Sequence, residues 1–148
     1  MSKDMRIGQK GINMSEKLIQ AALEARKKAY TPYSHYQVGA ALLLEDSEII
    51  TGCNIENASY GATCCAERTA VFKAVSEGKR KFSAIAIVGG LEGEELVDYA
   101  YPCGICRQVL SEFGGAQLKV IVAKSVTDYK EYTLGELLPA SFGGESIR

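Results

Sequence analysis

Two short cysteine-containing segments most restrict the fold that this chain can adopt. The first is Cys65-Ala66-Glu67, and the second is Pro102-Cys103-Gly104-Ile105-Cys106. Three cysteine sulfurs can hold Zn²⁺ and leave one coordination position open for water, whereas a fourth protein ligand would close that position. The fold is therefore expected to bring both segments to one point. Glu67 is then expected to stand beside the metal as a proton carrier and not as a ligand.

The length and charge of the chain favour one catalytic or binding domain. Its 148 residues suffice for a single buried core, and 17 basic residues against 18 acidic ones leave little long-range field to attract a nucleic acid. No apolar run approaches the roughly 20 residues of a membrane span, so no membrane partner and a cytoplasmic location are expected. In that reducing compartment, five cysteines favour metal ligation or reactive thiols over disulfides.

The pattern of helices and strands predicts an α/β protein. Residues 1–12 are polar, contain two glycines and are expected to form a flexible N-terminal tail, and residues 13–148 are expected to form a single domain. Turn and capping signals predict helices over 13–30, 66–78, 103–113 and 134–138, and strands over 38–44, 49–55, 82–88, 118–123 and 129–133. The strand over 82–88 is expected to end at Gly89-Gly90. This order predicts a three-layer α/β/α sandwich with a mixed five-stranded sheet.

The three candidate ligands fall at predicted helix starts. Cys65 begins the second predicted helix, and Cys103 and Cys106 begin the third. The positive end of each helix dipole favours thiolate over thiol. Three thiolates around Zn²⁺ leave a net negative charge, which weakens the metal as a Lewis acid. Arg68 is the candidate to donate hydrogen bonds to the sulfurs and withdraw part of that charge.

Other interpretations of the cysteines remain open. Cys64 is expected to have a packing role, and Cys53 is the candidate fourth ligand of a closed, structural zinc site. A Cys-x-x-Cys pair can also be a redox dithiol, but Pro102 stands where such motifs usually have an aromatic residue, and Glu67 would then be unexplained. His35, the only histidine, is expected to be a surface or packed side chain.

From residue 15 to residue 142 the chain resembles the small, homotetrameric type of cytidine deaminase. The stretches that carry the resemblance are Cys53-Asn54-Ile55-Glu56-Asn57-Ala58-Ser59-Tyr60, Cys65-Ala66-Glu67-Arg68-Thr69-Ala70, Pro102-Cys103-Gly104-Ile105-Cys106-Arg107-Gln108 and Glu136-Leu137-Leu138-Pro139. The resemblance implies one Zn²⁺ per subunit and a nucleoside substrate. It implies that cytidine and 2′-deoxycytidine are hydrolysed to uridine and 2′-deoxyuridine with release of ammonia, in pyrimidine salvage.

The resemblance also implies roles for individual residues. Asn54 and Glu56 would bind the ribose hydroxyls, although a polar strand end in a turn is the alternative for this pair. Tyr36 would pack on the pyrimidine, where phenylalanine is the expected residue. Backbone groups of Ala66 would touch the base. Other subunits of the tetramer would contribute to each shared site through Tyr60 and Phe142.

Three rival functions remain as alternatives to this resemblance. A blasticidin-type drug deaminase shares the cysteine segments, but its substrate has no ordinary ribose for Asn54 and Glu56 to bind. A deaminase that edits RNA or DNA would require a basic channel, which the near-neutral charge does not supply. A zinc-stabilised binding module is the alternative from outside the enzymes.

Overall fold

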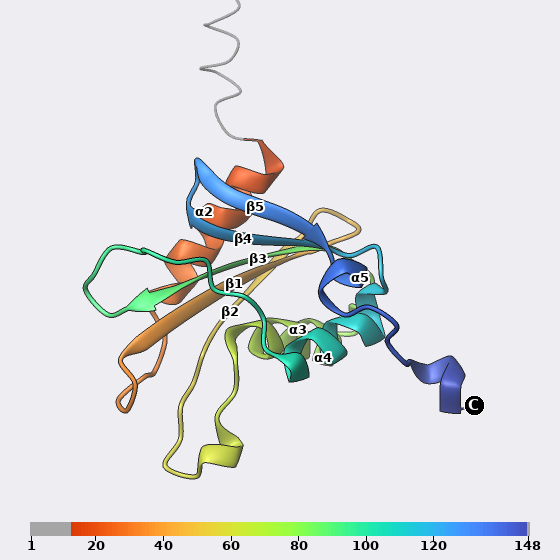
Figure 1. The fold of residues 1–148 in the computed structure, drawn as a ribbon, viewed down its shortest axis with the longest axis horizontal. Coiled ribbons are helices and arrows are strands. Elements are labelled where there is room, and N and C mark those ends of the chain that lie inside the picture. The colour runs from red at the N-terminus through yellow and green to blue at the C-terminus, as the bar shows by residue number, and fades with distance from the viewer. Residues whose placement is uncertain (1–12, 148) are drawn as a thin grey trace, which may run out of the picture.

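Within residues 13–147, five strands form one mixed sheet in the order β2-β1-β3-β4-β5 (Figure 1). The structure is a computed structural model that describes residues 13–147, so the predicted tail over residues 1–12 lies outside the described residues. The strands are β1 Tyr36–Leu44, β2 Ile49–Cys53, β3 Phe82–Leu91, β4 Lys119–Ser125 and β5 Asp128–Thr133. β1 pairs antiparallel with β2 and β3, β3 pairs parallel with β4, and β4 pairs antiparallel with β5. The predicted mixed five-stranded sheet is confirmed.

Helices cover both faces of this sheet (Figure 1). They are α2 Met14–Arg26, α3 Ala66–Ser76, α4 Gly104–Gly114 and α5 Leu134–Leu137, with short 3₁₀ turns η1 Tyr60–Ala62 and η2 Gly144–Ile147. α2 packs on one face, and α3, α4 and α5 pack on the other, so that two separate apolar cores form. Successive strand residues point to opposite faces, and Ala41 accordingly joins the core under α2 while Leu42 joins the core under α3. The three-layer prediction is confirmed.

Two glycines let the helices approach the sheet closely. A Cβ atom at Gly39 would lie 2.0 Å from the carbonyl oxygen of Ala22 in α2. On the other face, a Cβ atom at Gly52 would lie 2.5 Å from the backbone nitrogen of Ala70 in α3. Larger residues at either position would push a helix layer away from the strands, so these glycines fix how α2 and α3 sit on the sheet.

The first helix is shorter than the sequence predicts. α2 ends at Arg26 instead of continuing to Tyr30. The backbone nitrogen of Tyr30 donates to the carbonyl oxygen of Asn54 at 3.0 Å, and the nitrogen of Glu56 donates to the carbonyl oxygen of Tyr30 at 2.8 Å. Tyr30 therefore pairs with the chain that follows β2, and pairing between segments remote in sequence overrides the local helical pattern.

The prediction that β3 ends at Gly89-Gly90 is wrong. β3 continues to Leu91 because its last residues pair with the start of β1, with Leu91 opposite Tyr36. A Cβ atom at Gly89 would lie 2.9 Å from the Cβ of Ala100, and one at Gly90 would lie 2.5 Å from Leu96. These glycines therefore make room for the segment that follows the strand, and do not break the strand.

That following segment, residues 92–103, runs from the end of β3 across the molecule to the start of α4 (Figure 1). Among the described helices, none has the length and apolar character that crossing a membrane requires.

Candidate active site

Three cysteine sulfurs meet where α3 and α4 begin. Cys65 is the N-cap of α3 and Cys103 the N-cap of α4, and Cys106 lies buried in the first turn of α4. Their Sγ atoms all lie within 4.8 Å of one another, and those of Cys65 and Cys103 are 3.8 Å apart. Two sulfurs at about 2.3 Å from one tetrahedral zinc would also be about 3.8 Å apart. Soft sulfur donors at this spacing fit zinc and do not fit the hard cations that prefer oxygen.

The neighbouring groups favour the thiolate form of Cys65. Hydrogen bonds with Cys106 and from Arg68 lower the pKa of Cys65 to about 5. The same contact with Cys65 raises the pKa of Cys106, so the two sulfurs share a proton. A metal ion displaces such a proton when it binds.

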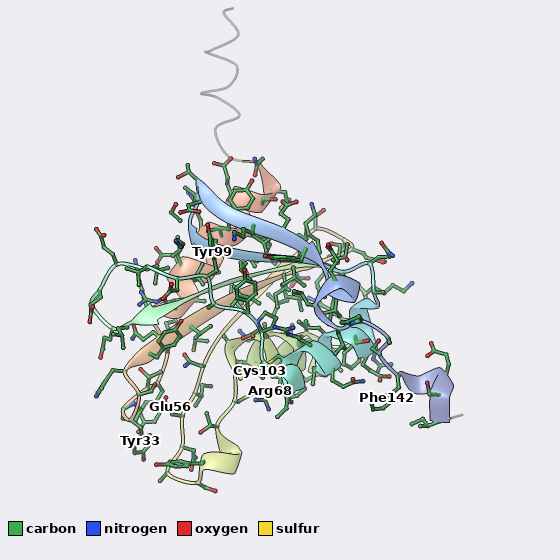
Figure 2. The ribbon with its side chains drawn as sticks, in the orientation of Figure 1. Tyr33, Glu56, Arg68, Tyr99, Cys103 and Phe142 are labelled. Atoms are coloured by element: carbon green, nitrogen blue, oxygen red, sulfur yellow. The ribbon has the colours of Figure 1, made fainter. Side chains whose placement is uncertain are left out.

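Arg68 brings positive charge to the sulfurs. Its Nη2 donates to Sγ of Cys65 at 3.3 Å, and its pKa is raised above the ordinary arginine value by that hydrogen bond. Its Nε is buried and has no hydrogen-bond acceptor among residues 13–147. A positively charged, buried donor next to the anionic sulfurs offsets part of the negative charge of the sulfurs. Figure 2 shows Arg68 and Cys103 together at the starts of α3 and α4.

Glu67 is one of the few buried ionisable side chains in the described chain, with 4% of its surface exposed. It lies in the first turn of α3 and lines a cavity together with Cys65. Burial raises the pKa of Glu67 to about 7. A carboxylic acid with this pKa can both accept and donate a proton near neutral pH.

A cavity of about 320 Å³ opens beside the sulfurs. Among the residues predicted from the sequence, it is lined by Tyr36, Asn54, Ala66 and Glu67 and by the candidate ligands Cys65 and Cys103. This volume suits a small organic molecule. A larger hollow, of about 510 Å³, lies at the other end of β1 near Leu44, where no three-sulfur group is found within the described residues.

Asn54 and Glu56 hold the chain that carries Tyr36. Oδ1 of Asn54 accepts from the nitrogen of Val38 at 2.9 Å, and its Nδ2 donates to the carbonyl oxygen of Tyr36 at 2.9 Å. The carboxylate of Glu56 accepts from the backbone nitrogens of Tyr33 and of residue 34 at 3.0 and 3.2 Å. A hydrogen bond from the Ser34 hydroxyl, together with these two backbone bonds, lowers the pKa of Glu56.

The structure does not bring all predicted residues to the cavity. Asn54 lines it, but Glu56 does not, and Figure 2 shows Glu56 beside Tyr33 and away from Cys103. Tyr60 lies on η1 with 81% of its surface exposed, and Phe142 is 63% exposed. Phe142 also lies far from Cys103 on the C-terminal segment (Figure 2). Within one chain, Tyr60 and Phe142 therefore form no part of the cavity wall.

The remaining cysteines and the histidine stand apart from the three sulfurs. Cys53 and Cys64 are not members of the three-sulfur group. Cys64 is predicted to have a packing role, yet it lines the cavity, and its Sγ accepts from the Thr69 hydroxyl at 3.7 Å. His35 is exposed, and its Nδ1 lies 3.8 Å from a carboxylate oxygen of Glu92.

Sequence reasoning missed part of the cavity wall. The missed residues are Val38, Thr63, Cys64, Ile87, Tyr99, Ala100 and Tyr101. The alternation Tyr-Ala-Tyr directly before the Pro102-Cys103 segment is a signal for the last three, because residues next to a metal ligand must lie close to the metal. Thr63 and Cys64, directly before Cys65, carry the same signal, whereas Val38 and Ile87 carry none, since only the packing of β1 and β3 places them there.

The fold and the site together define an α/β protein with three sulfurs that could hold a metal ion beside a buried carboxyl group, the arrangement found in metal-dependent hydrolases. Residues 12–123 match the family described as "Cytidine and deoxycytidylate deaminase zinc-binding region". The chain therefore belongs to the cytidine and deoxycytidylate deaminase family.

Individual relatives agree with this assignment. The cytidine deaminase of Halalkalibacterium halodurans is 51% identical over 130 residues, which cover 88% of this chain and 95% of the relative. The cytidine deaminase of Sporosarcina psychrophila is 49% identical over 132 residues, covering 89% and 93%. The crystal structure of the cytidine deaminase from Burkholderia pseudomallei superposes with a TM-score of 0.77 at 48% identity, covering 85% of this chain and 97% of that one.

Proposed function

We propose that this protein hydrolyses cytidine and 2′-deoxycytidine to uridine and 2′-deoxyuridine and releases ammonia, a reaction of pyrimidine salvage. The observation that carries the proposal is the buried carboxyl group of Glu67, which lines a cavity of substrate size beside three sulfur ligands. The family of the chain and the names of its relatives support the same reaction.

The residues that would hold zinc are Cys65, Cys103 and Cys106. When bound, zinc acts as a Lewis acid and makes water nucleophilic at neutral pH. Glu67 takes one proton from the attacking water and delivers it to N3 of the cytosine as C4 becomes tetrahedral. It then transfers the second proton of that water to the amine, which leaves as ammonia while C4 regains a carbonyl group. Arg68 stabilises the anionic sulfurs throughout.

The nucleoside would be oriented by residues from three segments. Tyr36 would pack on the pyrimidine ring, and backbone groups of Ala66 would bond the base. Asn54 and Glu56 would bind the ribose hydroxyls. Both have capacity left, because an amide has one more donor and acceptor site than Asn54 uses, and a carboxylate accepts up to about four hydrogen bonds.

A homotetramer with shared sites would give the two exposed aromatic residues a role. Tyr60 and Phe142 expose most of their surface in one chain, and such side chains are typical of contacts between subunits. We propose that each reaches the cavity of a neighbouring copy. We also propose that the enzyme works in the cytoplasm, where its five cysteines stay reduced.

The tetramer is tested by light scattering, which should give four times the chain mass, and by Phe142→Ala, which should raise KM. A monomer with full activity would contradict this part of the proposal.

The reaction is tested with a panel of substrates. Cytidine, 2′-deoxycytidine, cytidine monophosphate and blasticidin S are incubated with the zinc-loaded protein, and the loss of cytosine absorbance and the release of ammonia are measured. We expect turnover of the first two only. Turnover of blasticidin S alone would assign a drug deaminase, and no turnover despite a full complement of zinc would indicate a binding module.

The role of Glu67 is tested by Glu67→Gln, which keeps the size of the side chain. We expect kcat to fall by about 10²- to 10⁴-fold, the range of general acid–base catalysis, with zinc content unchanged. The matched control is Glu77→Gln at the exposed end of the same helix, which should keep wild-type kcat. Undiminished turnover by Glu67→Gln would refute the assigned role.

A further inference from the structure

One wall of the cavity has no regular secondary structure. Between the end of β3 and the start of α4, Tyr99, Ala100, Tyr101 and Cys103 line the cavity, and residues 99–103 belong to neither a helix nor a strand. A segment without a ladder of backbone hydrogen bonds must be held in place by other contacts. The position of residues 99–103 therefore depends on the side-chain contacts that they make with neighbouring elements.

Strand β5 presents one face to this segment. Asp128, Lys130 and Tyr132 occupy alternate positions and so share a face. Tyr132 packs against the core under α3 and α4, where Tyr99 and Ala100 also pack. The intervening residue Tyr129 packs against the core under α2 on the opposite side of the sheet.

Tyr99 is held by three charged groups. Its hydroxyl donates a hydrogen bond to the carboxylate of Asp128, and this bond raises the pKa of Tyr99, which keeps the hydroxyl protonated as a donor. The Nζ atoms of Lys124 and Lys130 lie 4.6 and 4.9 Å from the centre of the Tyr99 ring, at cation–π distance. Figure 2 shows Tyr99 next to β4 and β5.

Tyr101 is held by a second contact of the same face. Its hydroxyl lies 3.0 Å from the hydroxyl of Tyr132, so one donates to the other. The two rings meet edge to face, with centroids 5.8 Å apart and an interplanar angle of 63°. Tyr99 and Tyr101, which both line the cavity, thus each form a hydrogen bond with a residue of β5.

We infer that the face of β5 formed by Asp128, Lys130 and Tyr132 positions the cavity wall at Tyr99 and Tyr101 and thereby sets how tightly the nucleoside is held. The inference rests on the proposed deaminase function. Neither Asp128 nor Tyr132 lines the cavity, so both are positioning residues that act through the tyrosines of the wall.

The end of this segment next to Cys103 is held by separate hydrogen bonds from Arg107. Nε of Arg107 donates to the carbonyl oxygen of Pro102, and its Nη1 donates to that of Leu137 in α5, both at 2.7 Å. This clamp holds the peptide before Cys103 independently of Tyr99 and Tyr101. Loosening the tyrosine contacts should therefore weaken nucleoside binding while the ligands and Glu67 stay in place, so KM rises and kcat and zinc content persist.

The test uses substitutions that remove single polar contacts. Tyr132→Phe, Tyr101→Phe and Asp128→Ala should each raise KM for cytidine by about fivefold, the expected loss for one hydrogen bond. The double variant Tyr101→Phe with Tyr132→Phe should raise KM no more than either single change, because both remove the same contact. Zinc content, kcat and the melting temperature are measured alongside.

Matched controls lie on the other face of the same strand. Tyr129→Phe and Glu131→Ala remove comparable groups there, including the acceptor of a hydrogen bond from Ser15, and should keep the wild-type KM. Unchanged KM in the test variants, additive effects in the double variant, or a fall in melting temperature without a rise in KM would each overturn the inference while leaving the deaminase function intact. A wild-type protein that does not deaminate cytidine would overturn the proposed function first and this inference with it.

Discussion

The two faces of the sheet are built from the same kinds of element but differ in what they bury. Under α2, the core consists of apolar residues such as Leu18, Ile19 and Ala22, with at most 1% of their surface exposed. Under α3 and α4, the core contains the buried carboxyl group of Glu67 and borders a cavity of about 320 Å³. One face is closely packed, and the other contains the candidate active site.

The difference follows from where the helix starts lie, since the sides of α2 and of α3 both pack on the strands. α2 lays its side along the strands, and side chains at helical spacing fill the interface. α3 and α4 bring their starts to one point, where unpaired backbone N–H groups and the positive ends of the helix dipoles favour anionic sulfur. The two faces together indicate that helix starts form the candidate site in this fold and that helix sides form the apolar packing.

Removal of a ligand should produce the largest change. Cys103→Ala deletes one of three sulfurs, so zinc content should fall sharply and kcat should fall by more than about 100-fold, beyond the usual loss from an outer contact of a metal site. A chelator should lower the melting temperature of the wild type and not that of the variant, because only the wild type gains stability from bound metal.

The control for this change is Cys53→Ala, which removes a cysteine outside the three-sulfur group and should keep zinc and activity. Full zinc content and activity in Cys103→Ala would show that the helix starts do not form the metal centre.

A smaller effect is expected from Arg68→Gln on the same face. The substitution removes the charge and the 3.3 Å hydrogen bond to Cys65, so the sulfurs become more electron-rich and the metal a weaker Lewis acid. Zinc should stay bound while kcat falls by about 10- to 100-fold. Arg80→Gln, at an exposed position after α3, is the matched control and should be silent. Wild-type kcat in Arg68→Gln would remove this arginine from the account of the site.

The smallest effect on turnover is expected from a substitution in the apolar core under α2. Ile19→Ala opens space in the core under α2 and should lower the free energy of unfolding by about 2 to 5 kcal/mol. Below the melting temperature, kcat per folded molecule should equal that of the wild type. Gln20→Ala, an exposed neighbour in α2, should change the free energy of unfolding by no more than about 0.5 kcal/mol. A fall in kcat in folded Ile19→Ala would show that the two faces are not independent.

Local signals in the sequence predicted most elements of the fold. Asn13 and Glu16 form a capping box where the first predicted helix begins, and the strand predicted over 129–133 appears as β5. Predictions failed where a distant segment decides the outcome. Tyr30 leaves the helix because it pairs with the chain after β2, and Gly90 stays in β3 because β1 pairs with it.

The sequence by itself predicted the chemistry that we propose for this protein, because candidate sulfur ligands, a carboxyl group and an arginine at these spacings are properties of residue types and helix starts. Only the tertiary structure decided what stands behind the cavity. Asn54 bonds the chain around Tyr36, and Asp128 and Tyr132 reach the tyrosines of the wall, through contacts between segments remote in sequence. Such contacts depend on strand order and register, and a shift of one residue would turn these side chains to the other face of the sheet.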